Sequence, residues 1–190
     1  MRLFIAVDLD DAARASIAAV QQRIAAATRD ERSRVTWVKP DRMHLTLVFL
    51  GEVEAAGVPR IVAAVERPVD APPFDMALET IGTFPSTGAP RAIWVGVGAG
   101  AVQLTGLHAD VARRIGPLGL ALESRPFHPH LTLGRWKSSR PSDRRKALAA
   151  ASAGVIARTR VDCATLYHSQ LSSEGPTYTP LARATLSVGL

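Results

Sequence analysis

The chain has 190 residues and a formal net charge of +6, and its 47% hydrophobic and 21% charged residues are typical of a globular protein with a buried core. This composition excludes a disordered chain, and the lack of a long uncharged apolar run excludes a membrane-spanning helix. The N-terminal segment does not have the pattern of a signal peptide. The excess of Lys and Arg over Asp and Glu favours an anionic partner such as RNA.

The expected elements do not alternate strictly between strand and helix. In chain order we expect a strand over 2–7, a helix capped by Asp10 or Asp11 and running through Ile24, an extended piece at 36–38, a strand over 44–51, a helix over 57–65, strands over 74–84 and 91–97, a helix over 102–115, a strand over 127–134, a helix over 140–151, and extended segments over 155–167 and 177–188. Several strands follow one another directly, which disfavours a doubly wound parallel sheet and favours an α+β fold with antiparallel sheet.

The tetrapeptide His-Leu-Thr-Leu occurs twice, at 44–47 and at 130–133. Each copy begins an apolar strand and is followed by a helix-like segment and then by two extended segments. No linker long enough to separate independent domains is present. We therefore expect a single domain over residues 1–190 that is built from two similar lobes, each of which contributes one motif strand.

The single cysteine, Cys163, excludes an internal disulfide and a cysteine-rich metal site. It lies in an apolar-alternating run and is expected to be a small buried residue. Such cysteine usage indicates a reducing, cytoplasmic location.

The motif residues suit chemistry at a phosphodiester. Residues two apart in a strand share a face, so each motif places its histidine and threonine on one face and its two leucines on the other, in a core. Displacement at phosphorus needs a base for the nucleophile and an acid for the leaving oxygen, and two histidines can supply both near neutral pH. The threonine hydroxyls can donate hydrogen bonds to the non-bridging oxygens. The scheme requires no metal ion and no cofactor, and a strained 2′,3′-cyclic phosphate is a natural substrate for it.

The flanks of the motifs sharpen this interpretation. Four segments resemble the RNA 2′,3′-cyclic phosphodiesterases, formerly called 2′-5′ RNA ligases, of the 2H phosphoesterase superfamily: WVKPDRMHLTLVFLGEV (37–53), RAIWVGV (91–97), FHPHLTLGR (127–135) and LYHSQLSSEGPTYTPL (166–181). The likeness covers essentially the whole chain.

The resemblance implies two pseudo-symmetric lobes of antiparallel sheet, with helices on the outer side and an active-site cleft between them. It implies hydrolysis of a terminal 2′,3′-cyclic phosphate, on RNA or a small cyclic nucleotide, to a 2′-phosphate. By this resemblance His44 is the proton donor and His130 the proton acceptor. The two motifs are identical, so their residues alone do not decide which histidine has which role. Thr46 and Thr132 carry over as phosphate ligands, and Arg135 as a cleft residue that holds the phosphate or stacks on the terminal base.

The remaining histidines and aromatic residues are expected outside the catalytic centre. We expect His128 at the rim of the cleft, and His108 and His168 in structural or exposed positions. Phe49 is expected to pack in the core, although its ring could instead stack on a base. The tryptophans Trp37, Trp94 and Trp136 are expected to be scaffold, with Trp136 close to the cleft.

Two other functions remain open at this point. The same groups would serve the reverse reaction, which joins tRNA halves through a 2′-5′ bond. The second alternative is a module that binds RNA ends without catalysis, although binding alone does not need two titratable imidazoles. A monomer is the expected state of the chain, with no membrane partner.

Overall fold

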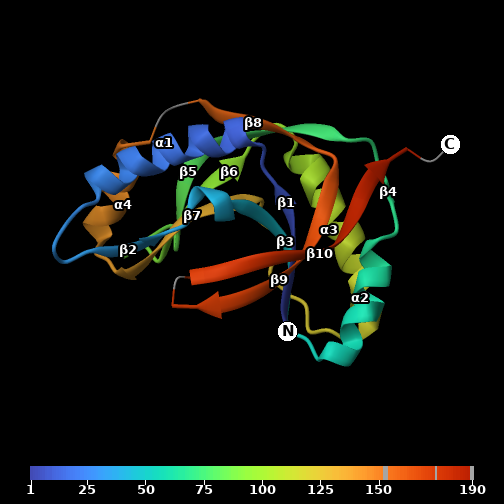
Figure 1. Ribbon diagram of the computed structural model, residues 1–190. Helices are drawn as coiled ribbons and strands as arrows, with labels where there is room; N and C mark the ends of the chain where they lie inside the picture. The colour runs from blue at the N-terminus through green and yellow to red at the C-terminus, as the bar shows by residue number, and fades with distance from the viewer. Residues whose placement is uncertain (152–153, 174, 189–190) are drawn as a thin grey trace.

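Two five-stranded sheets form the framework of the computed structural model, which describes residues 1–151, 154–173 and 175–188 (Figure 1). The first sheet has the strand order β3-β1-β9-β10-β4, in which only β10 and β4 are parallel neighbours. The second sheet has the order β2-β7-β6-β5-β8 and is antiparallel throughout. The strands span Arg2–Asp8 (β1), Arg34–Trp37 (β2), His44–Glu52 (β3), Val69–Asp70 (β4), Phe74–Phe84 (β5), Ala92–Val97 (β6), His130–Ser138 (β7), Val155–Val161 (β8), Cys163–Ser172 (β9) and Gly175–Ser187 (β10).

Four α-helices of the described chain lie on the outer sides of the sheets (Figure 1). Helices α1 and α4 pack against each other and against β8 and β5 of the second sheet, whereas α2 and α3 pack against each other and against β10 and β3 of the first sheet. The predicted α+β fold with outer helices is confirmed. The helices span Asp11–Ala27 (α1), Val58–Val65 (α2), Ala101–Ile115 (α3) and Pro141–Ala149 (α4), with short 3-10 turns at Pro40–Arg42, Ala55–Gly57 and Gly116–Leu118.

Local sequence explains where the long helices form. The Asp10 carboxylate accepts a hydrogen bond of 2.7 Å from the backbone N–H of Ala13 and so caps the start of α1. In α3 the buried residues recur at helical spacing, which makes one apolar face for the core. They are Leu104, Leu107, Val111 and Ile115. None of the helices in the described ranges is long and apolar enough to cross a membrane.

Some expected boundaries and positions were wrong. The extended segment predicted over 155–167 divides at Asp162 into β8 and β9, which belong to different sheets. The strand predicted from residue 127 begins at His130 and continues to Ser138. Cys163 is half-buried, not fully buried. Glu174, within the segment 166–181 that carries part of the resemblance, lies outside the described residues.

Strands β3 and β7 are structural copies of each other. Along their nine residues they have the same sequence of buried, half-buried and exposed positions. In each lobe a bulge interrupts the pairing at the fourth motif residue, because the partner strand skips Leu47 in one sheet and Leu133 in the other. The repeat in the sequence is therefore a repeat in structure, down to the same irregularity.

Candidate functional site

The two motif strands lie close together although they belong to different sheets. Some Cα atoms of β3 and β7 are within 8 Å of one another. The backbone N–H of Val38, which leads toward the first motif, donates a hydrogen bond of 2.9 Å to the carbonyl of Leu133 in the second motif. The buried amide of Gln21 in α1 donates to both carbonyls, at 2.7 Å to Val38 and 2.9 Å to Leu133. The segment before one motif is thus fastened to the other motif.

Both motifs present their polar side chains on one face of the strand. The histidines and threonines are half-buried, whereas the four leucines are at most 4% exposed. The predicted division into an anchoring face and a polar face is confirmed. The polar face of β3 carries His44 and Thr46, and that of β7 carries His130 and Thr132.

The two imidazoles are held in the same way. The ring atom Nδ1 of His44 lies 2.8 Å from the carbonyl oxygen of Arg42, and Nδ1 of His130 lies 2.7 Å from that of His128. A carbonyl oxygen only accepts hydrogen bonds, so Nδ1 is the donor and carries the hydrogen in both rings. This leaves Nε2 of each ring to give or take a proton.

Burial lowers the pKa of both histidines below the ordinary value of 6.5. For His44, the Arg42 carbonyl and the Asp8 carboxylate oppose this effect, and the Arg14 guanidinium adds to it. For His130, the carbonyl of His128 opposes it. The positive charges of His128 and Arg135 lower the pKa of His130 further. Both rings are therefore neutral more readily than a histidine in water.

Aromatic rings surround both histidines. Phe4 of β1 stacks on His44 with a centroid separation of 4.8 Å, and the Tyr178 ring of β10 meets it edge-on at 5.1 Å. In the other lobe Phe84 lies edge-on to His130 at 5.1 Å and Trp94 at 6.1 Å. These rings restrict the imidazoles to a narrow range of orientations.

The bulges bring a further residue of each strand onto the polar face. Ala6 and Phe4 of β1, which share a face, pair with Thr46 and Phe49. The Phe49 side chain therefore lies on the face of His44, and it is 54% exposed, so its expected place in the core was wrong. The same geometry applies in the second lobe, where Trp94 and Ala92 of β6 pair with Thr132 and Arg135.

Arg135 links the two halves of this site electrostatically. Its side chain is exposed, and its positive charge lowers the pKa of His130 and counteracts the rise that burial causes in the pKa of Tyr178. Tyr178 in turn contacts His44. The charge of Arg135 therefore acts on His130 and on a tyrosine that contacts His44.

The other candidates take up the following positions. His128 is exposed, as expected for the rim, and its ring is 5.9 Å from that of His130. His108 stacks on Phe127 at 4.2 Å, and the half-buried His168 lies in β9. Trp136 is only 8% exposed and does not share the polar face.

Trp94 is the tryptophan beside the motif. It pairs with Thr132, its ring contacts His130, and its buried indole nitrogen has no hydrogen-bond partner. Gly82 gives this ring its room, since a Cβ atom at that position would overlap it. Trp94 was expected to be scaffold, and its contact with His130 depends on the register of β6 with β7.

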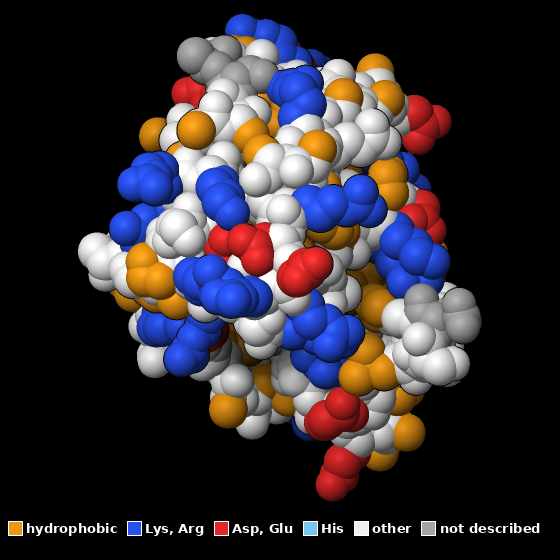
Figure 2. Space-filling model, turned by 90° about the vertical axis from the view of Figure 1, so that its left-hand side faces the viewer, with side chains coloured by type: hydrophobic (Ala, Val, Ile, Leu, Met, Phe, Trp, Pro, Cys, Tyr) orange, Lys and Arg blue, Asp and Glu red, His pale blue; other side chains and the backbone are white. Residues whose placement is uncertain are grey.

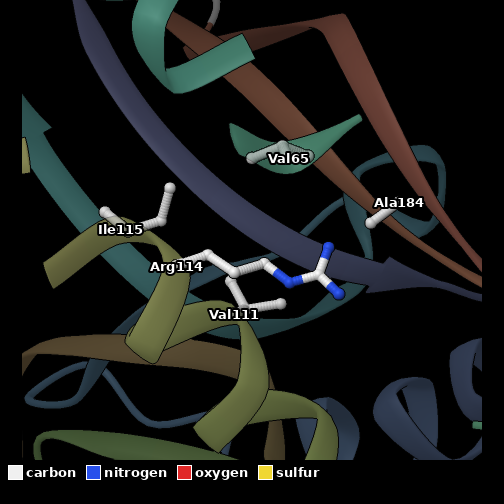
Figure 3. Close-up of a pocket in the computed structure, with 5 residues that line it drawn as sticks. All are labelled: Val65, Val111, Arg114, Ile115 and Ala184. Carbon is white, nitrogen blue, oxygen red and sulfur yellow. The ribbon is translucent and has the colours of Figure 1, made fainter. Parts of the chain in front are cut away.

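The cavity in Figure 3 does not belong to this site. It lies between α2, α3 and β10, and the Arg114 side chain is among the residues that line it (Figure 3). Arg114 donates to the carbonyl of Pro68 at 2.8 Å and pairs with the Asp110 carboxylate at 2.6 Å, so its polar atoms are occupied. Within the described ranges, no three His, Cys, Asp or Glu side chains are grouped to hold a metal ion.

Comparison with known proteins gives one consistent result. The model of the 2′-5′ RNA ligase superfamily matches residues 9–171. A protein of Archaeoglobus fulgidus named RNA 2′,3′-cyclic phosphodiesterase is 36% identical over 141 residues, which are 74% of this chain and 76% of that protein. A protein of Thermotoga maritima with the same name is 29% identical over 191 residues, 100% of this chain and 98% of that one.

Solved structures agree with this similarity. The protein TT0787 of Thermus thermophilus superposes with a TM-score of 0.80 at 27% identity, over 97% of both chains. E. coli LigT complexed with 3′-AMP superposes with a TM-score of 0.72 at 29% identity, over 98% of both chains. The likeness in fold therefore extends over nearly the whole chain.

Proposed function

Because the chain belongs to the 2′-5′ RNA ligase superfamily, we propose that it is a hydrolase that opens a terminal 2′,3′-cyclic phosphate of RNA to a 2′-phosphate. The observation that carries the proposal is the paired geometry of the two histidines, each with Nδ1 held by a carbonyl and Nε2 left for proton transfer. Relatives named RNA 2′,3′-cyclic phosphodiesterase support the choice of substrate.

In the proposed reaction the two histidines act on opposite sides of the phosphorus atom. His130 takes a proton from water through Nε2, and the water oxygen attacks phosphorus. The bond from phosphorus to the 3′ oxygen breaks, and His44 gives its proton to that oxygen. Thr46 and Thr132 donate hydrogen bonds to the non-bridging oxygens, where negative charge increases in the transition state.

The rest of the RNA is proposed to bind through charge and stacking. Figure 2 shows Lys and Arg side chains spread over the face at the α4 and β2 side of the molecule, with fewer acidic side chains between them. Such a surface attracts the phosphate backbone without regard to sequence. On the polar face of the motifs, exposed Arg135 offers a positive charge for a phosphate and exposed Phe49 a ring for a base.

We propose further that the reaction needs no metal ion, because two imidazoles and two hydroxyls supply every proton transfer and phosphate contact that it requires. Residues 1–190 act as one domain in this scheme, because the two motifs come from different sheets and neither sheet holds both histidines. A cytoplasmic monomer is proposed to be the active form.

The test uses a short RNA that ends in a 2′,3′-cyclic phosphate, incubated with the protein in EDTA, with identification of the product end. We expect a 2′-phosphate. A 3′-phosphate would keep the acid–base chemistry and overturn the orientation of the substrate, and activity that requires an added metal would overturn metal independence. An added RNA with a free 5′ hydroxyl tests ligation in the same tube, and binding without turnover would indicate a module that only binds RNA ends.

A further inference from the structure

The two lobes differ beside their histidines. Strand β1 pairs with β3 so that Asp8 is directly opposite His44, whereas β6 pairs with β7 so that Gly96 is directly opposite His130. Directly opposite residues of an antiparallel pair project from the same face, with Cβ atoms about 4.5–5.5 Å apart. One histidine therefore has a carboxylate for its cross-strand neighbour, and the other has no side chain there.

The Asp8 carboxylate is held by hydroxyl groups. The Tyr167 hydroxyl donates to one carboxylate oxygen at 2.7 Å, and the buried Thr165 hydroxyl donates to the other at 3.1 Å. Both donors come from β9, on the side of β1 away from His44. Among the residues that the structure describes, Asp8 forms no ion pair, so these neutral donors position its negative charge without cancelling it.

The charged groups near the two histidines differ in sign, although burial lowers the pKa of both rings. His44 is faced by Asp8 from β1, by Arg14 from α1 and by the Tyr178 ring from β10. His130 is influenced by Arg135 and His128, both positive when charged. Asp8 raises the pKa of His44, and in the other lobe no carboxylate opposes the two cations that lower the pKa of His130.

We propose that Asp8 is a positioning residue that favours the imidazolium form of His44 and thereby makes His44 the proton donor. This rests on the proposed function, in which one histidine must begin charged and the other neutral. His44 loses its Nε2 proton to the 3′ oxygen, while His130 gains one from water, so the pair returns to its starting state by one proton exchange with solvent. Together with the cations near His130, Asp8 gives the two identical motifs their different roles.

The test is Asp8→Asn, with turnover measured across pH. If His44 is the acid, a lower pKa of His44 reduces kcat/KM on the alkaline side of the optimum and leaves the acidic side unchanged. We expect a loss of about tenfold there, equal to a shift of about one pH unit, as for removal of a nearby opposite charge. Asp75→Asn is the control, because Asp75 is an exposed carboxylate at the far end of β5, paired with Arg160. A loss that is equal at every pH, or no loss, would overturn the proposal.

A second measurement is independent of turnover. NMR titration of the imidazole signals in the free protein should show the pKa of His44 lowered by about one unit in Asp8→Asn and that of His130 unchanged. If Asp8→Asn does not fold, Tyr167→Phe removes only the 2.7 Å hydrogen bond to Asp8 and should shift the pKa of His44 in the same direction by less. An unchanged pKa of His44 would overturn the role of Asp8, whereas a wild-type protein without turnover but with this shift would overturn only the proposed function.

Discussion

Phe49 and Arg135 occupy equivalent places in the two lobes, each five residues beyond a motif histidine and each exposed on the face of that histidine. The bulge at the fourth motif residue puts them there. One lobe thus offers an aromatic ring at this place and the other a guanidinium, which are the two groups best suited to a base and a phosphate.

Replacement of Phe49 should weaken RNA binding more than it affects the chemical step. A 54% exposed ring contributes little to the core, whereas stacking on a base is worth about 1–3 kcal/mol. We expect Phe49→Ala to raise KM for an RNA with a cyclic phosphate end by about tenfold, with kcat nearly unchanged. Val102→Ala, which removes another exposed apolar side chain in α3, is the control. Equal KM values for the two variants would argue against a stacking role.

Replacement of Arg135 should change both affinity and pH dependence. Charge-assisted hydrogen bonds contribute about 1.5–3 kcal/mol, so Arg135→Ala should raise KM by at least about tenfold. Arg135 also lowers the pKa of His130, so its removal raises that pKa and reduces kcat/KM on the acidic side of the optimum. Arg135→Lys keeps the charge and should restore the pH profile but not the full affinity. A pH profile that Arg135→Ala leaves unchanged would contradict the proximity to His130.

The pH dependence of the wild-type enzyme follows from the lowered pKa values of both histidines. In the proposed mechanism, activity rises with pH as His130 loses its proton and falls as His44 loses its own. Because both pKa values lie below 6.5, the maximum of kcat/KM should lie on the acidic side of pH 6.5. A flat profile from pH 5 to pH 9, or a maximum well above neutrality, would be incompatible with this pair.

Each histidine should be necessary for turnover. General acid or base catalysis contributes about 10²–10⁴-fold, so His44→Ala and His130→Ala should each lose that much in kcat. The double variant should lose much less than the product of the two single losses, because the two residues act as a unit in the proposed reaction. His108→Gln, in α3 and stacked on Phe127, controls for loss of an imidazole elsewhere. Circular dichroism of each variant separates lost activity from lost fold.

The spacing of apolar residues along the sequence was enough to predict the helices and strands that bury one apolar face. The apolar residues on one face of α3 and the leucines of both motifs are buried, as their spacing predicts. The expectation that Phe49 packs in the core was wrong. Unbroken alternation along the strand would place residue 49 on the leucine face. The bulge at Leu47 shifts the alternation by one residue and so turns Phe49 to the polar face. The matching bulge at Leu133 likewise removes Trp136 from the polar face.

Pairings between distant segments could not be read from the sequence. Asp8 becomes the neighbour of His44 only through the register of β1 with β3. The split at Asp162 is of the same kind, because the two halves of one apolar run join different sheets. Such relationships depend on the whole fold, and they decide the surroundings of the motif residues.

Gln21 should be important for stability, although it lies outside the site. Its buried amide donates to the carbonyls of Val38 and Leu133. Without it the Leu133 carbonyl keeps the Val38 N–H, whereas the Val38 carbonyl loses this donor, and a buried acceptor left without a donor costs about 1–3 kcal/mol. We expect Gln21→Leu to lower the free energy of unfolding by about that amount in chemical denaturation. Gln22→Leu, the same change at the exposed neighbouring position of α1, should have little effect. Equal stability of the two variants would show that the amide does not hold the first motif to the second.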